Sequence, residues 1–363
     1  MTAPPADLDQ LVNHARVLVC CGSGGVGKTT TAATLALQGA KLGRRAVVVT
    51  IDPAKRLADT LGIGSLTNTP IRIEGSWPGE LWAMMLDTKS TFDQLVIKHS
   101  TDAAQAQRIL GNRFYRNISG ALSGTQEYMA GEKLYELHDE ADFDLVVVDT
   151  PPAHNALDFI DASRRLTNFL DHRLYRMLMT PTRAYLRAVN LAAQAFVRTV
   201  SKVIGGEVLE DALAFFSAFE GMEEGFRQRA EGVQALLAAE ATAFVLVASP
   251  RADAVAEARF FADRLRESNI AVAALIVNRV HPQFSRGHVE SDRAQARLAL
   301  GTALEPLYTN LADLRALAEG EETNLADLGA QVEPASVTRV PLLEDDVHDL
   351  VSLDRIAAHL FGR

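Results

Sequence analysis

Cysteine is nearly absent from this chain of 363 residues: the only two, Cys20 and Cys21, are neighbours. Adjacent residues of a strand point to opposite faces of a sheet, so a disulfide between these two would be strained. The pair therefore excludes a disulfide framework. It predicts two reduced thiols that pack as small apolar groups in a cytoplasmic protein.

Positive charge and long apolar runs are also scarce. Lysine and arginine number 36 against 46 acids, and the formal net charge is −10, which argues against a nucleic-acid partner because phosphate backbones need a dense positive surface. No apolar run approaches the ~20 residues of a membrane span, and the polar N-terminus has no signal-peptide pattern. We expect a cytoplasmic protein without a transmembrane segment.

Short apolar runs are what the sequence does contain. They are rich in Val, Ile and Leu and do not alternate with polar residues, which is typical of strands buried on both faces. Helix-period stretches separate them, so the sequence predicts an α/β fold with a mostly parallel sheet flanked by helices. The runs are Val17–Cys21, Ala46–Ile51, Leu81–Leu86, Leu145–Val148, Ala243–Ala248 and Ala271–Val277.

The first apolar run leads into "GSGGVGKTT", which fits the phosphate-loop pattern G-x-x-x-x-G-K-[ST]. Its glycines let backbone N–H groups converge on phosphate oxygens, and the following helix, expected over 30–42, adds its positive N-terminus. Lys28 would neutralise the β- and γ-phosphates, and the Thr29 hydroxyl would hold Mg²⁺. The alternative, a glycine-rich turn with a chance lysine, fits the strand–loop–helix setting less well. The expected nucleotide-binding residues here are Gly24, Gly25, Val26, Gly27, Lys28, Thr29 and Thr30.

Two aspartates end later strands. Asp52, in "VVVTIDPAKRLADTLGI", lies where strand ends meet the crevice of an open α/β sheet, and it could orient a water for attack on the γ-phosphate. It could equally cap a helix that begins with Asp–Pro. Asp149, in "DFDLVVVDTPPAH", has the setting of a carboxylate that contacts Mg²⁺, with a solvent-facing strand end as the alternative. His154 would sense phosphate or cap the turn.

Together, "GSGGVGKTT", "TIDPAKRLADTLG" and "DTPPAHNALDF", in this order and spacing, resemble the deviant Walker A ATPases of the ArsA and guided-entry branch, which targets tail-anchored proteins. The later segments "ASPRADAVAEA" and "ALIVNRVHP" fit too, so the resemblance covers nearly the whole chain. It is similar above all to the paired ArsA-like ATPases of actinobacteria. The resemblance implies one ATPase domain over 1–363. The stretches 88–141 and 158–241, which read as mainly helical, would be insertions that form a subdomain.

The resemblance also implies roles. Asp52 would activate the attacking water, Asp149 would help to hold Mg²⁺, and Asn278 would recognise adenine with the segment around Pro341 passing near the base. ATP and Mg²⁺ would be the cofactors, with Asp52 and Lys28 as the catalytic pair. Two subunits would close face to face over ATP and reopen on hydrolysis.

Ser23 stands where this family carries a signature lysine that reaches the partner's nucleotide. Serine supplies no positive charge to a transition state, and such a charge can be worth several powers of ten in rate. Either a homodimer hydrolyses ATP slowly, or the partner in a heterodimer is a lysine-bearing paralogue.

Other departures concern metals and clients. The C-x-x-C zinc pair of the tail-anchored branch is absent after Asn278, where only His281 and His288 remain, and no cysteine is available for arsenite, so no zinc or metalloid site is expected. Residues 164–202 carry eight basic side chains and the single acid Asp171. This stretch could meet an anionic membrane surface or a protein client, or pack within the helical subdomain. The amphipathic C-terminus carries acids that favour packing in the core.

Three functions follow as hypotheses. The first is a Mg²⁺-dependent ATP hydrolase that switches a dimer and so controls a client or partner. The second is a nucleotide-gated regulatory module with little turnover. The third is a targeting or chaperone factor at a membrane surface, dependent on Arg173, Arg176, Arg183 and Arg187.

Overall fold

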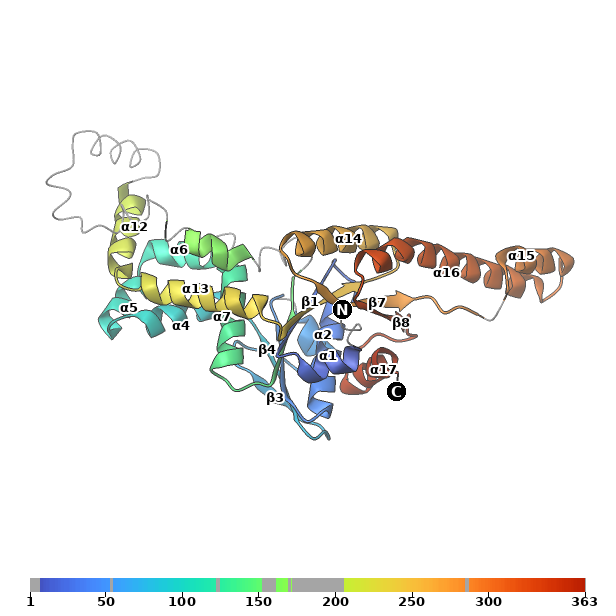
Figure 1. Cartoon of the computed structure of the whole chain (residues 1–363), viewed down its shortest axis with the longest axis horizontal. Helices are drawn as coiled ribbons and strands as arrows, with labels where there is room; N and C mark the ends of the chain where they lie inside the picture. The colour runs from blue at the N-terminus through green and yellow to red at the C-terminus, as the bar shows by residue number, and fades with distance from the viewer. Residues whose placement is uncertain are drawn as a thin grey trace. The chain divides into compact units, whose positions relative to one another are not determined.

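The computed structural model describes residues 7–52, 55–121, 125–151, 161–168, 171, 206–284 and 287–362. The chain divides into two compact units (Figure 1). The sheet unit comprises Met1–Met85, Phe143–Leu157 and Glu240–Arg363, and the helical unit comprises Leu86–Asp142 and Asp158–Ala239.

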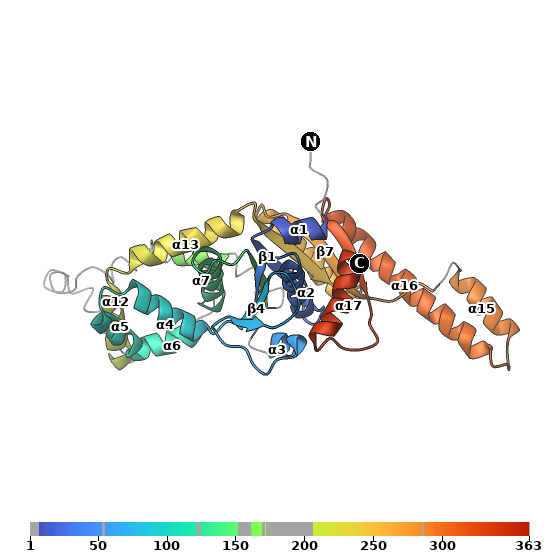
Figure 2. The ribbon, with the colours of Figure 1, turned by 90° about the horizontal axis from the view of Figure 1, so that it is seen from below.

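An eight-stranded sheet forms the centre of the sheet unit, in the order β3-β4-β2-β5-β1-β6-β7-β8. All neighbouring strands are parallel except β3 and β4. The predicted α/β class with a mostly parallel sheet is thus confirmed, and helices lie against the sheet in Figure 2. The strands are β1 Val17–Gly22, β2 Arg45–Thr50, β3 Ile71–Ile73, β4 Glu80–Met85, β5 Leu145–Asp149, β6 Thr242–Ala248, β7 Val272–Val280 and β8 Ser336–Pro341.

Each of the six apolar runs corresponds to one of these strands, and two strands have no counterpart among the runs. β3 is a three-residue antiparallel edge, too short for a pattern to show. β8 is the opposite edge, and its residues are mostly half-exposed or exposed, so it carries polar side chains that a fully buried strand would lack.

Seven helices accompany the sheet in the described part of this unit. α2 is buried along most of its length because alanine, leucine and threonine face the strands, and Leu35 joins one core cluster with Leu18 and Val48. The helices are α1 Leu8–His14, α2 Lys28–Lys41, α3 Arg56–Leu61, α14 Ala252–Glu267, α15 Val289–Leu298, α16 Glu305–Gln331 and α17 Leu350–Phe361.

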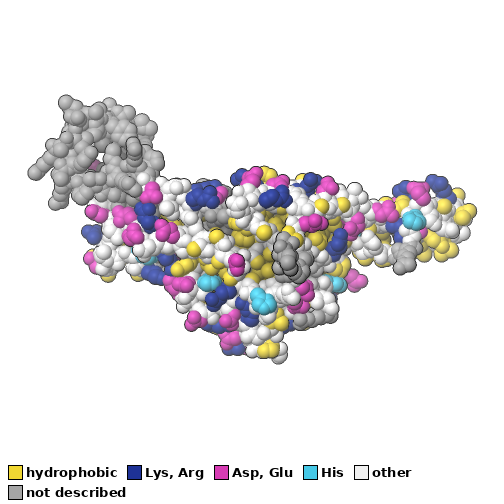
Figure 3. Space-filling view, viewed as in Figure 1, with side chains coloured by type: hydrophobic (Ala, Val, Ile, Leu, Met, Phe, Trp, Pro, Cys, Tyr) yellow, Lys and Arg dark blue, Asp and Glu magenta, His cyan; other side chains and the backbone are white. Residues whose placement is uncertain are grey.

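The C-terminal helix α17 packs into the core, as its acidic residues led us to expect. Asp349 and Ser352 form a capping box at its start, which satisfies backbone N–H groups that an uncapped helix leaves unpaired. Leu353, Ile356 and Leu360 are buried. By contrast, apolar side chains gather on the surface at the end of the α15–α16 hairpin (Figure 3), where Leu298, Leu300, Leu304 and Leu307 are exposed.

The helical unit has a core of its own, rich in aromatic rings. Phe219 packs on Phe226 with ring centroids 5.0 Å apart, and Tyr115 stacks on Phe215 at 6.1 Å. Its helices include α4 Thr88–His99, α5 Ala103–Leu110, α6 Arg113–Ala121, α7 Thr125–Asp139, α12 Gly206–Phe219 and α13 Glu223–Ala238, and residues 161–168 are helical as well.

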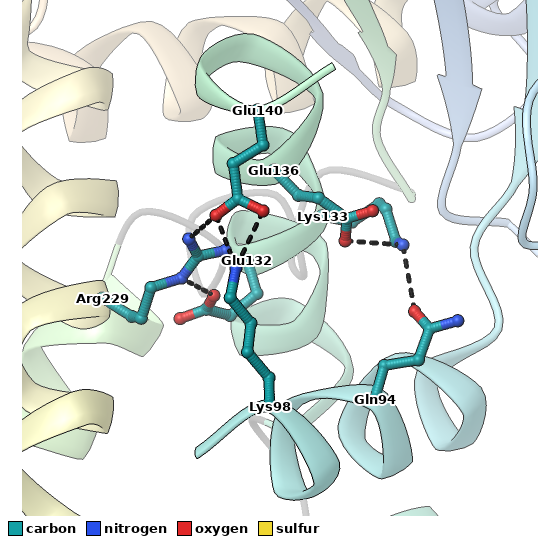
Figure 4. Close-up of polar contacts among 7 residues, drawn as sticks. All are labelled: Gln94, Lys98, Glu132, Lys133, Glu136, Glu140 and Arg229. Carbon is teal, nitrogen blue, oxygen red and sulfur yellow. Dashed lines mark hydrogen bonds and ion pairs between the residues drawn. The ribbon is translucent and has the colours of Figure 1, made fainter.

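A charged cluster joins three helices of this unit around a cavity of about 220 Å³ (Figure 4). Arg229 of α13 donates to Glu132 of α7 at 2.8 Å and also to Glu140, which follows α7. Lys98 of α4 donates to the same Glu140 carboxylate at 2.6 Å. Glu132 is only 1% exposed, so the guanidinium must offset the cost of burying its charge.

We expect Arg229→Met to lower the stability of the helical unit by about 3 kcal/mol, because Glu132 would stay buried without a cation. The measurement is urea-induced unfolding followed by circular dichroism. Lys98→Met is the control: its partner is half-exposed, and its loss should remain below about 1 kcal/mol. Adding Glu132→Gln to Arg229→Met should recover part of the loss, and equal effects of the two single variants would contradict this account.

Candidate functional site

The site begins where β1 turns into α2. Gly22 ends the strand with φ 153°, and a Cβ atom there would lie 2.1 Å from the carbonyl oxygen of Val247 in β6. Gly27 caps α2 in the left-handed region at φ 96°. These two positions exclude side chains, and they explain two of the glycines that the phosphate-loop pattern demands.

Lys28 is the first residue of α2, and its side chain turns back over the loop. The ammonium donates to the carbonyl oxygen of Ser23 at 2.8 Å. Burial lowers the pKa of Lys28, although the nearby Asp149 carboxylate raises it. A largely desolvated cation at the mouth of a glycine loop suits an anionic ligand, for which it needs no reorganisation.

Asp149 ends β5, between β1 and β2. The parallel register sets Thr50 of β2 beside it, and the Thr50 hydroxyl donates to Asp149 Oδ2 at 2.9 Å. The Thr29 hydroxyl of α2 donates to the same oxygen at 2.7 Å. Asp149 is 1% exposed, so the solvent-facing alternative is wrong.

Burial raises the pKa of Asp149, while the two threonine hydroxyls and Lys28 lower it. The second oxygen, Oδ1, is buried and forms no hydrogen bond with the described residues. A hydroxyl, a carboxylate with a lone oxygen, and a neighbouring phosphate loop make a donor set of the kind that Mg²⁺ prefers. The residues present therefore fit a magnesium ion.

Asp52 follows β2 and is partly buried. Its Oδ2 lies 3.5 Å from a guanidinium nitrogen of Arg56. Helix α3 begins at Arg56 with Lys55 as its N-cap, so Asp52 is not the helix cap that the sequence also allowed. Residues 53 and 54 lie outside the described part.

Two consecutive residues at the end of β7, Asn278 and Arg279, donate hydrogen bonds to the phosphate loop. The Asn278 amide donates to the Val26 carbonyl oxygen at 3.0 Å, and Arg279 Nη1 donates to that of Gly25 at 3.0 Å. A Cβ atom on Gly27 would lie 2.2 Å from the Asn278 amide nitrogen. In this structure the amide of Asn278, which we expected to recognise adenine, donates to the loop.

A cavity of about 630 Å³ opens beside these groups at the carboxyl ends of the parallel strands, the usual place for a ligand in such a fold. Val26 alone among the expected site residues does not line it, because its side chain is buried. The expected residues that line it are Gly24, Gly25, Gly27, Lys28, Thr29, Thr30, Asp52, Asp149, Asn278 and Pro341.

Ser23, which stands where the ATPases that the sequence resembles are expected to carry a lysine, is 3% exposed. Its hydroxyl is buried and forms no hydrogen bond with the described residues. Neither charge nor reach is available to this side chain, so it presents no cation to a second molecule.

Three contributors were not expected from the sequence: Thr50, Arg56 and Arg279. Thr50 could have been found from the parallel register, which aligns the ends of β2 and β5. Arg56 stands four residues after Asp52, a spacing that pairs charges on a helix. Arg279 gave no such signal, because strand alternation points it away from Asn278.

The remaining predictions concern histidines and arginines. A ring nitrogen of His281 lies 2.6 Å from a carboxylate oxygen of Glu321, whereas His288 is exposed at the start of α15. His154, Arg173, Arg176, Arg183 and Arg187 lie outside the described residues.

Within the described ranges, no three or more His, Cys, Asp or Glu side chains gather as metal ligands would. A magnesium site of one hydroxyl and one carboxylate, completed by nucleotide phosphates, does not need such a group. Among the same residues, none of the helices combines the length and hydrophobicity of a membrane span.

Comparison with known proteins adds the family. The model of the family described as "Anion-transporting ATPase" matches residues 15–310. The ATPase asna-1 of Caenorhabditis elegans is 32% identical over 38% of this chain and 42% of its own length. An ATPase ASNA1 homolog of Trypanosoma cruzi is 24% identical over 99% and 95%, and a putative arsenical pump-driving ATPase 2 of Aquifex aeolicus is 25% identical over 74% and 81%. The chain thus spans less than half of the first relative's length but nearly all of the second's.

We expect Lys28→Met to stabilise the nucleotide-free protein. A base whose pKa is lowered by folding is disfavoured in its charged form, so it destabilises the fold below its folded pKa, and this effect fades as the pH rises towards its ordinary value. The thermal midpoint should rise by about 2 °C or more at pH 7 and by less at pH 10. Lys41→Met, on the same helix but at the surface beside Asp354, should not raise it, and a lower midpoint for Lys28→Met would contradict the argument.

Proposed function

Because the chain belongs to the anion-transporting ATPase family, we propose that it is a Mg²⁺-dependent ATP hydrolase whose nucleotide cycle switches a dimer between conformations and so controls a client or partner. The observation that carries the proposal is the convergence on one cavity of Lys28, Thr29, Asp52 and Asp149, which come from three different strand ends. A cation, a hydroxyl and two carboxylates around a glycine loop are the groups that phosphoryl transfer to water requires.

Each residue then has a task. Loop amides and Lys28 bind the phosphates, and Asp52 orients the attacking water and takes its proton. Thr29 and Asp149 hold Mg²⁺, which neutralises charge on the phosphates when it is bound. Asn278 and Pro341, at the ends of β7 and β8, line the same cavity, and in this proposal they hold the base. ATP is the nucleotide, and the cytoplasm is the compartment that this chemistry suits.

Ser23 favours a heterodimer. Its phosphate loop is of the deviant type but lacks the signature lysine. The chain would therefore depend on a lysine-bearing paralogue to supply a cation across the interface. The helical unit would carry the client site. Homodimers of this chain would then hydrolyse ATP slowly.

The same observation favours one second candidate. A buried, uncharged side chain at position 23 is also what a regulatory subunit would carry if it bound nucleotide with little turnover. Turnover that depends on Asp52 separates the two candidates.

We expect Asp52→Asn to lower the turnover of Mg-ATP by about 100-fold or more while nucleotide affinity stays within a few-fold, because the carboxylate acts on water rather than on phosphate. Phosphate release and equilibrium binding provide the two measurements. Asp263→Asn, on the surface of α14 beside Arg266, is the control and should match the wild type. Binding without any Asp52-dependent turnover would favour the regulatory module.

The heterodimer predicts that adding a lysine-bearing paralogue raises ATP turnover at least tenfold over the sum of the separate chains. A mixture with the paralogue's signature lysine changed to alanine is the matched control, and it should lose the increase. Equal rates with and without the paralogue would remove the reason for proposing the pair.

A further inference from the structure

The end of β7 departs from regular strand geometry beside the phosphate loop. Val277 pairs with Arg339 of β8 and Val280 pairs with Pro341, so Asn278 and Arg279 together stand opposite one residue. This two-against-one arrangement is a β-bulge, and bulges next to ligand sites re-aim side chains.

The bulge brings two neighbouring side chains to the same loop. Regular alternation would send residues 278 and 279 to opposite faces of the sheet. Instead, Asn278 and Arg279 donate to the consecutive carbonyl oxygens of Val26 and Gly25. The Asn278 side-chain oxygen also accepts from the Arg279 backbone N–H at 2.9 Å, which ties the two residues together.

Arg279 adopts an unfavourable backbone conformation to make this contact. Its φ is +63°, the left-handed region that glycine and asparagine enter far more readily than arginine. Such a conformation persists where the surroundings hold it, and it gathers at functional sites. This backbone conformation accompanies the placement of the Arg279 guanidinium at the cavity, whose lining includes Arg279.

Arg279 and Arg56 both line the cavity, but they differ in their contacts. Arg56 lies beside the Asp52 carboxylate. Arg279 contacts a neutral carbonyl, and it forms no ion pair with any carboxylate in the part of the chain that the structure describes. Its side chain is exposed, and its remaining N–H donors are available to an anion.

We propose that Arg279 is a phosphate-binding residue that supplies, from within the same chain, positive charge at the outer side of the loop. The Gly25 carbonyl anchors one arm of the guanidinium, and the other arm faces the phosphates of the bound nucleotide. The inference rests on the proposed function, since it assigns a further residue to the same site. It gives the site a cation besides Lys28 where Ser23 has none to offer.

Three substitutions of Arg279 separate the effects of its charge, its hydrogen bond to the Gly25 carbonyl and its backbone conformation. Arg279→Gly removes the side chain and relieves the left-handed φ, so its thermal midpoint should not fall. Arg279→Gln retains a donor for the Gly25 carbonyl without the charge, and Arg279→Lys retains the charge. The matched control is Arg264→Ala, a surface arginine of α14 paired with Glu267.

The measurement is calorimetric titration of the full-length chain with Mg-ADP and with a non-hydrolysable Mg-ATP analogue. Arg279→Gly and Arg279→Gln should raise the Kd about tenfold, and Arg279→Lys should stay within about threefold of the wild type. The difference between wild type and Arg279→Gln should shrink at high salt, because an exposed charge is screened and a neutral hydrogen bond is not.

Wild-type affinity in Arg279→Gly would overturn the assignment. Wild-type affinity in Arg279→Gln, or equal weakness of the Gln and Lys variants, would overturn the role of the charge. These results differ from a failure of the proposed function, in which the wild type and Arg264→Ala would not bind either nucleotide. Lys28→Ala provides the reference for lost binding.

Discussion

Two opposite charges, the Lys28 ammonium and the Asp149 carboxylate, are buried near the carboxyl ends of the adjacent strands β1 and β5. The surrounding residues stabilise these buried charges. Burial opposes the charged form of both groups. The protein offsets this with a carbonyl oxygen for the lysine and two threonine hydroxyls for one carboxylate oxygen. Charges held this way suit the proposed ligand, a nucleotide with its Mg²⁺, because buried groups with shifted pKa values are typical of functional sites.

A second shell of contacts keeps the loop in shape around these charges. The backbone carbonyl oxygens of the loop need hydrogen-bond donors. Asn278 and Arg279 supply two of them from a distant strand. The absence of side chains at Gly22 and Gly27 lets β6 and Asn278 approach closely. The geometry of the site is therefore set by residues from several strands and not by the glycine motif alone.

The sequence was sufficient for the sheet and for the chemistry of the loop, and the reasons are physical. Uninterrupted runs of Val, Ile and Leu are what burial on both faces demands, so β1, β2 and β4 to β7 could be predicted from the sequence. The edges β3 and β8 lack that demand. Lys28, Thr29 and Asp149 could be proposed from the sequence because a phosphate loop needs them at fixed spacings and strand ends, and the structure brings all three to one cavity. Arg279 could not be found, because the bulge that redirects it depends on pairing with β8, 60 residues further along.

The strand order has a consequence for how the protein is made. β1 leaves the ribosome first, yet its two neighbours in the sheet are β5 and β6, whose last residues are Asp149 and Ala248. A nascent chain that ends before Ala248 carries the complete glycine motif but has only one flank of its central strand in place. Until Arg279 has emerged, the loop also lacks the side chain that donates to the Gly25 carbonyl oxygen. The central strand therefore gains its second neighbour only late in synthesis, and until then one edge of this apolar strand has no partner in the sheet.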